Sequence, residues 1–99
     1  VITSPAMLRS NEPEKAIELF DVIAYPNPFN NHFEISLQSS DNSKVSVLVY
    51  DMVGRLIEDK NVNANEVSTI ELGTNYPTGV YNVIVSQSNN QRSFRMIKR

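Results

Sequence analysis

Apolar and polar residues alternate along most of the chain from Asp21 onward. A period of two is typical of β-strands that bury one face against a core. The clearest alternating positions are Phe33-Ile35-Leu37, Val45-Val47-Val49 and Tyr81-Val83-Val85. Weaker stretches of the same kind are Asp21–Tyr25, Leu56–Asp59, Ile70 with Leu72, and Phe94 with Met96. Seven short strands joined by turns predict an all-β, mostly antiparallel sandwich.

Residues 1–20 lack this alternation and predict a linker or tail ahead of a domain over residues 21–99. A short helix at 12–20 is an alternative for part of this segment. Asn11 is a suitable cap for it, and Glu12 and Glu14 suit the positive end of a helix dipole. A helix of so few turns is marginal unless it packs against the rest of the protein.

One predicted hairpin turn is specified by an aspartate and a glycine. In Asp51-Met52-Val53-Gly54, Asp51 suits the first position of a type I turn, and Gly54 suits a left-handed residue that closes a bulged hairpin. The expected cross-strand pairs are Asp51 with Arg55, Tyr50 with Leu56, and Val49 with Ile57. Pro77-Thr78-Gly79 predicts a similar turn, because proline sets φ at the second position.

The last hairpin is expected to turn at Asn89-Asn90, because asparagine tolerates the positive φ of a type I′ turn. This turn pairs Val85 with Phe94 and Val83 with Met96, so the apolar residues of both strands share one face. A slip of one residue would move them to the other face, so we expect this register.

Two prolines interrupt strand pairing in Tyr25-Pro26-Asn27-Pro28-Phe29. Proline donates no backbone hydrogen bond, and the residue before it is pushed towards extended conformations. We expect a stiff elbow at which the chain leaves one sheet and enters the other. Tyr25 and Phe29 are the expected anchors of this elbow.

Composition excludes several kinds of function. Ninety-nine residues with 40% apolar and 20% charged content suit one small globular domain without a deep catalytic cavity. The net charge of −2 argues against nucleic-acid binding, which needs clustered Lys and Arg. The absence of cysteine excludes disulfides and thiolate metal sites. No apolar run reaches the length of a transmembrane helix.

Candidate chemistry is sparse along the chain. His32, the one histidine, is expected to be exposed and to share its face with Glu34, and two ligands do not make a metal site. The carboxylates considered as paired acids are Asp41, Asp51, Glu58 and Asp59. Turn-forming or solvated roles are favoured for them, so the sequence predicts no catalytic, cofactor or metal site.

Two side-chain groups leave alternatives open. The tyrosines considered as a sugar-stacking platform are Tyr25, Tyr50, Tyr76 and Tyr81. Core or corner packing is favoured for them, because two adjoin prolines in turns. Leu48, Ile84 and Ile97 fall on outward faces, and they would form a docking patch if they adjoin.

Four short motifs follow one another in a fixed order: Tyr25-Pro26-Asn27-Pro28-Phe29, Val49-Tyr50-Asp51-Met52-Val53-Gly54-Arg55, Pro77-Thr78-Gly79-Val80-Tyr81, and a last strand ending Ile97-Lys98-Arg99. In this order and spacing they resemble the type A C-terminal sorting domain of cargo of the type IX (Por) secretion system of Gram-negative bacteria. The resemblance covers residues 22–99. The positions carried over are Pro26, Asn27, Pro28, Gly54, Arg55, Gly79, Tyr81, Lys98 and Arg99. The tail departs from the family, since it mixes Arg and Lys where the family often has a Lys-rich strand.

The resemblance implies an immunoglobulin-like sandwich that acts as an export signal for a larger passenger protein. Its implied partners are the outer-membrane secretion machinery, including a sortase-like peptidase and a shuttle protein. In the family, that peptidase removes the domain and joins the passenger to an anionic lipopolysaccharide. The domain would be a substrate and not an enzyme, cut within residues 1–20. The implied route is through the periplasm to the cell surface or the medium, without nucleic acid, small-molecule substrate or cofactor.

The last five residues are the expected docking element, because a free terminal strand can pair with a partner by β-augmentation and its basic residues can steer association. A dimer through an exposed strand edge is left open. The alternative function is an accessory sandwich of a secreted multidomain enzyme, either carbohydrate-binding or a spacer. The export interpretation expects Arg99 to be the encoded terminus, whereas an accessory module can lie anywhere in its parent chain.

Overall fold

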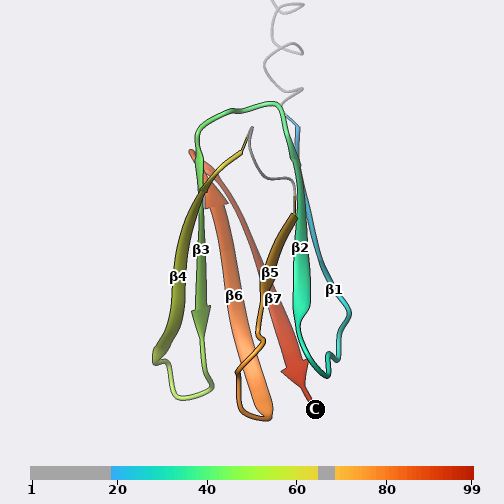
Figure 1. Cartoon of the computed structure of the whole chain (residues 1–99). Helices are drawn as coiled ribbons and strands as arrows, with labels where there is room; N and C mark the ends of the chain where they lie inside the picture. Colours follow the sequence, from blue (N-terminus) through green and yellow to red (C-terminus); the bar gives the residue numbers. More distant parts are fainter. Residues whose placement is uncertain (1–18, 65–68) are drawn as a thin grey trace, which may run out of the picture.

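The protein is a β-sandwich of two antiparallel sheets, as a computed structural model that describes residues 19–64 and 69–99 shows (Figure 1). The strands are β1 (Phe20–Tyr25), β2 (Phe33–Ser39), β3 (Lys44–Tyr50), β4 (Leu56–Asn63), β5 (Thr69–Leu72), β6 (Gly79–Gln87) and β7 (Asn90–Lys98). One sheet has the order β1-β2-β5 and the other β4-β3-β6-β7. The predicted seven-stranded, all-β sandwich is therefore confirmed. None of the described residues forms a helix long and apolar enough to span a membrane.

The expected helix at 12–20 lies outside the described residues, except for its last two positions. Of these, Leu19 is exposed and Phe20 begins β1 with a buried side chain.

Alternating side chains from both sheets meet in one core. Burial of each of these residues contributes on the order of 1.5–3 kcal/mol to stability, which is how the period of two in the sequence becomes a fold. The buried apolar residues are Phe20, Val22, Phe29, Phe33, Ile35, Leu37, Val45, Val47, Val49, Ile70, Leu72, Tyr81, Val83, Val85 and Met96.

The β3–β4 hairpin has the predicted turn. The Gly54 amide donates to the Asp51 carbonyl (3.0 Å), and Gly54 has a φ of 89°. The Asp51 amide donates to the Arg55 carbonyl (3.0 Å) and Tyr50 faces Leu56, as expected. The expected pair of Val49 with Ile57 is wrong. A bulge shifts the register between Val49 and Tyr50, so that Val49 faces Glu58.

The predicted register of the last hairpin is wrong by two residues. Val83 faces Phe94, and Gln87 faces Asn90, so the turn is Ser88–Asn89, with a φ of 53° at Ser88. A shift of two keeps every side chain on its face, so the alternation could not distinguish the two registers.

The proline elbow connects two neighbouring strands of one sheet, so the predicted passage between sheets is wrong. β1 and β2 pair directly, and the peptide bonds before Pro26 and Pro28 are both cis. Phe29 is fully buried, as expected of an anchor, whereas Tyr25 is 44% exposed and is not one. The elbow nevertheless reaches the second sheet, because Phe29 forms a parallel bridge with Lys98 of β7.

The loop before β6 turns earlier than predicted. The Tyr76 amide donates to the Gly73 carbonyl (3.2 Å), and Gly73 has a φ of 93°. Gly79 already belongs to β6 and is not one of the residues with a positive φ.

Candidate functional site

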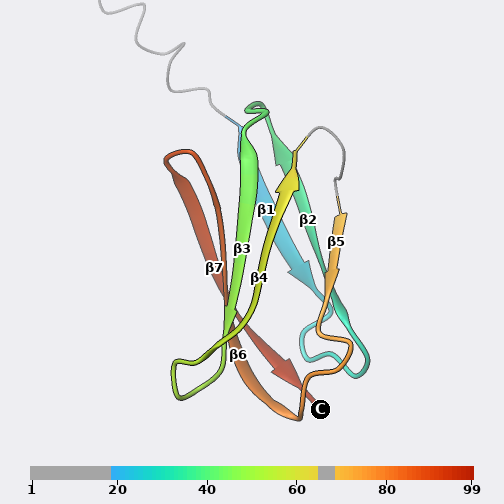
Figure 2. The same ribbon diagram turned by 60° about the vertical axis from the view of Figure 1, so that its left-hand side comes forward.

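The four sequence motifs meet at one end of the sandwich, which we call the motif pole (residues 25–29, 51–55, 73–81 and 95–99). Figures 1 and 2 show the elbow, the β3–β4 turn, the β5–β6 loop and the last residue at this end. The start of β1, the β2–β3 loop and the β6–β7 turn lie at the opposite end. Strand direction explains the gathering, because the β1–β2, β3–β4 and β5–β6 connections and the end of β7 all lie at the same end of the sandwich.

Asn27 binds the backbone of β7 with both ends of its side-chain amide. Its Nδ2 donates to the Arg95 carbonyl (2.8 Å), and its Oδ1 accepts the Ile97 amide (3.0 Å). Phe29 continues this pairing through its backbone. The Phe29 amide donates to the Ile97 carbonyl (2.8 Å), and the Arg99 amide donates to the Phe29 carbonyl (2.9 Å). The proline elbow is thus hydrogen-bonded to the last residues of the chain.

The two basic residues at the chain's end differ in their surroundings. The Lys98 ammonium donates to the Tyr76 carbonyl (3.0 Å) and lies 5.6 Å from the centre of the Phe29 ring, a cation–π distance. Lys98 therefore joins β7 to the β5–β6 loop and is half-buried. Arg99 is exposed, so it is the freer of the two charges.

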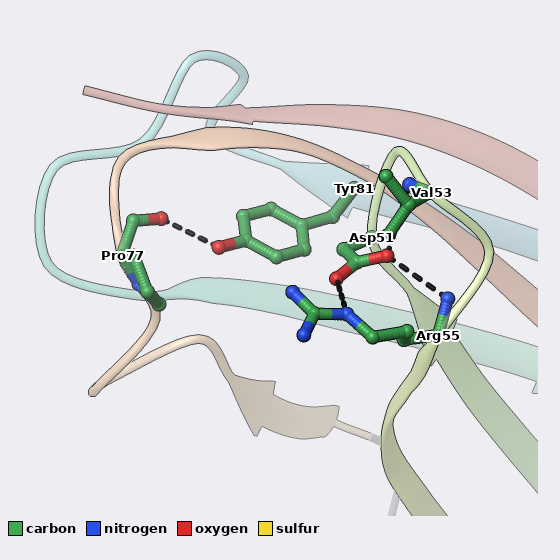
Figure 3. Close-up of polar contacts among 5 residues, drawn as sticks. All are labelled: Asp51, Val53, Arg55, Pro77 and Tyr81. Atoms are coloured by element: carbon green, nitrogen blue, oxygen red, sulfur yellow. Dashed lines mark hydrogen bonds and ion pairs between the residues drawn. The ribbon is translucent and has the colours of Figure 1, made fainter.

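Asp51 organises the β3–β4 turn, as Figure 3 shows. Its Oδ1 accepts the amides of Val53 (3.1 Å) and Arg55 (2.9 Å), and its Oδ2 accepts the Arg55 Nε (2.8 Å). The Arg55 amide, more than any other group, holds the pKa of the Asp51 carboxyl below its usual value. The ordered turn leaves Met52 and Val53 73% and 76% exposed at its tip.

Tyr81 closes the loop before its own strand. Its hydroxyl donates to the Pro77 carbonyl (2.6 Å) four residues upstream, as Figure 3 shows. This is the tyrosine corner of immunoglobulin-like sandwiches. The rings of Tyr76 and Tyr81 pack 4.9 Å apart, and the Tyr76 hydroxyl donates to Glu58 (2.6 Å). Burial raises the pKa of both hydroxyls. The ring contact and the two hydroxyl hydrogen bonds place these tyrosines at a corner, the role favoured from the sequence.

Two hollows flank the β3–β4 turn. One, of about 620 Å³, lies on the outer face of the four-stranded sheet between the turn and β7. Its lining includes Met52, Gly54 and Arg95. The second, of about 350 Å³, lies between the turn and the start of β6, where Arg55 approaches Gly79 and Tyr81. The predicted motif residues Gly54 and Arg55 of one segment therefore share adjoining surface with Gly79 and Tyr81 of another.

Sequence reasoning missed Gly73 and Gln87. A Cβ on Gly73 would come within 2.8 Å of the Phe29 ring. The only sequence signal for this position is an isolated glycine directly after β5. Gln87 is buried, and its Nε2 donates to the carbonyls of Asp41 and Ser43 (both 2.9 Å). A polar residue on the apolar-alternating face of β6 was the available signal for it.

The remaining candidates do not gather into a site. His32 lies 3.7 Å from Glu34 and 3.8 Å from Glu71, and the described residues include no group of three side chains that could hold a metal ion. Leu48 and Ile84 are direct partners across β3 and β6. Ile97 instead faces Val80, nearer the motif pole.

Comparison with known proteins finds a matching family and similarity to parts of two larger proteins. The family model described as "Secretion system C-terminal sorting domain" matches residues 23–99. An endo-acting ulvan lyase of Formosa agariphila is 32% identical over 79 residues, which are 80% of this chain and 15% of that protein. The crystal structure of dimeric latent PorU from Porphyromonas gingivalis matches with a TM-score of 0.54 at 23% identity, over 82% of this chain and 9% of that one. This likeness concerns the fold, which is immunoglobulin-like as predicted.

Proposed function

This chain belongs to the family of secretion system C-terminal sorting domains, the export signals of type IX secretion, and we propose that outer-membrane secretion machinery recognises it at the motif pole. The convergence of the family motifs at that one end carries the proposal. A sorting domain is not itself catalytic. The chain spans about 15% of the length of the ulvan lyase, which supports a larger passenger whose activity this domain does not supply.

The position of the pole suits a signal that serves many passengers. We take residues 1–20 as the linker and residues 21–99 as the sorting domain. A passenger joined ahead of β1 would approach the end of the sandwich opposite the motif pole. Its size and shape then leave the recognised surface open, so one surface can serve unrelated cargo.

The route and the partners form part of the same proposal. The folded domain crosses the periplasm with its passenger, and a shuttle protein and a sortase-like peptidase of the machinery bind it. The peptidase cuts within residues 1–20 and attaches the passenger to the cell surface. The domain is the substrate of that step, and its closed core with shallow surface hollows supports binding by a protein partner.

Transfer of export to a reporter tests this proposal. The whole 99-residue chain is fused behind a reporter with a general secretory signal, in a bacterium that has the type IX system. We expect the reporter outside the cell, and Arg55→Ala to lower the exported fraction several-fold. Arg92→Ala is the matched control, because Arg92 is an exposed arginine that bonds the Phe20 carbonyl (3.2 Å) at the opposite end.

Two results would contradict the proposal at different points. A wild-type reporter that stays in the periplasm, together with saturable glycan binding by the purified chain, would favour an accessory module. Equal export of the Arg55 and Arg92 variants would leave the sorting role intact and move the recognised surface away from the β3–β4 turn.

A further inference from the structure

We infer that Asn27 is a positioning residue that holds the end of β7 in place, so that the machinery recognises the side-chain face of the last strand and not its backbone edge. This inference rests on the proposed function and names the surface and the chemistry that its partner must match.

The backbone edge of β7 is already occupied at the motif pole. The groups directed away from β6 include the Arg95 carbonyl, the Ile97 amide and carbonyl, and the Arg99 amide. Asn27 binds the first two through its side chain, and Phe29 binds the other two through its backbone. Strand addition needs an unpaired edge. The elbow has therefore taken the place that a partner strand would need.

The chemistry of this contact calls for asparagine at position 27. A planar side-chain amide has a donor and an acceptor on one group, so it can bind a strand as another backbone would. Pro26 and Pro28 on either side donate no backbone hydrogen bond, so the side-chain amide of Asn27 supplies the hydrogen bonds to β7 at this point. An aspartate keeps the acceptor but loses the donor, and an alanine loses both.

The side chains on the outer face of β7 remain available. Ile97 is 40% exposed beside Val80, and Arg95 lines the 620 Å³ hollow together with Met52 and Gly54. In the described part of the chain, neither Arg95 nor Arg99 forms an ion pair. This face suits a protein surface that offers carboxylates to the arginines and an apolar patch to Ile97 and Met52.

The hydrogen-bonding role of Asn27 is tested on the purified 99-residue chain by amide hydrogen exchange. In Asn27→Ala we expect the Ile97 amide to exchange at least about tenfold faster, since it loses its acceptor. In Asn27→Asp the Ile97 amide should stay protected, because the acceptor remains. Unchanged Ile97 exchange in Asn27→Ala would overturn the role assigned to Asn27.

Recognition is tested with the reporter fusion. We expect Asn27→Ala to reduce export several-fold and Asn27→Asp to be intermediate. Ser39→Ala is the control, because it removes the hydroxyl bonded to Gln87 at the opposite end and should leave export unchanged. Export of Asn27→Ala at or above the wild-type level would mean that the backbone edge is the gripped element, and would overturn the inference.

Reversing the charge of Arg95 or Arg99 tests the side-chain face independently of whether Asn27→Ala folds. Arg95→Glu and Arg99→Glu leave the Asn27 contacts intact, since those use the backbone, and we expect each to lower export. Unchanged export in both would exclude the side-chain face. Failure of the wild-type fusion to reach the medium would instead defeat the proposed function.

Discussion

At the scale of single residues, Gly73 determines how the aromatic side chains meet beneath the motif pole. Its φ of 93° is a conformation that residues with a Cβ rarely adopt. A Cβ there would also lie 2.8 Å from the Phe29 ring and 3.1 Å from the Phe33 ring. These two rings pack 4.9 Å apart in the core, so neither can withdraw freely. Glycine is required here for two independent reasons.

Gly73→Ala is therefore expected to lower the free energy of unfolding by about 1–3 kcal/mol, the usual cost of overpacking a core. Gly79→Ala is the control, because a Cβ there meets only the Tyr81 ring at 3.9 Å and the backbone has no positive φ. It should change stability by no more than about 0.5 kcal/mol. Urea unfolding of both variants measures the difference, and equal losses would refute the steric argument.

The sequence predicted the conformation of Gly54 but not that of Gly73. Gly54 lies in a turn whose other determining residues, Asp51 and Arg55, belong to the same short motif, so the residue preferences of β-turns were sufficient to predict it. The demand on Gly73 comes from Phe29 and Phe33, which are distant in sequence. In the same way, the turn chemistry predicted a role for Asp51, whereas the partners of Asn27 lie 68 and 70 residues away. No local pattern contains such contacts.

At the scale of elements, the buried Gln87 holds the end of β6 against the segment that connects the two sheets. Its amide reaches the carbonyls of Asp41 and Ser43, and its Oε1 accepts the Ser39 hydroxyl. The β2–β3 loop is thereby tied to the end of β6. Gln87 is the last residue of β6 and faces Asn90 of β7, so these bonds lie beside the Ser88–Asn89 turn.

Gln87→Met keeps the side-chain length but leaves the two carbonyls without this donor. We expect a loss of about 1–3 kcal/mol in the free energy of unfolding, the cost of buried polar groups that lose their partner. Gln91→Met, at an exposed position on β7, serves as the matched substitution and should leave the denaturation midpoint nearly unchanged. A Gln87 variant as stable as the Gln91 variant would exclude this role.

Strand positions could be predicted from the alternation, because burial of one face imposes it on each strand. The partition into sheets could not. The elbow between β1 and β2 was expected to carry the chain from one sheet to the other, and this was wrong. Proline indicates where strand pairing stops, but it does not indicate which strands pair on either side of it. The bulge that sets Val49 opposite Glu58 was likewise invisible, because an inserted residue leaves no mark in composition.

At the scale of the whole molecule, ionisable groups at both ends bound the range of pH in which the sandwich is stable. At the motif pole, Asp51 has a lowered pKa, and Tyr76 and Tyr81 have raised ones, mainly because burial disfavours the charged phenolate. At the opposite end, hydrogen bonds, first from the Ser88 hydroxyl and then from Ser43, lower the pKa of Asp41. The folded state thus prefers ionised aspartates and neutral tyrosines.

We therefore expect the free energy of unfolding to fall on both sides of a broad plateau. The contribution of the aspartates is present above their unfolded pKa of about 4 and is lost as the pH falls through their folded values. The contribution of the tyrosines is present below about pH 10 and is lost as the pH rises above it.

Urea midpoints between about pH 2 and 12 measure the loss of stability on both the acid and the alkaline side, and Tyr76→Phe should flatten the alkaline loss. Tyr25→Phe, at an exposed position, is its control. A Tyr76 variant with an unchanged alkaline loss would contradict the assignment.

The contacts of Asn27 with Arg95 and Ile97 join residues near the beginning and near the end of the domain's sequence. A polypeptide interrupted anywhere before these residues, by premature termination or by proteolysis, lacks the partners of the elbow and cannot assemble the surface at that end. A complete motif pole therefore requires a domain whose sequence is complete up to β7. On the proposed function, we therefore expect proteins synthesised through to the final strand to be exported and truncated ones to be retained.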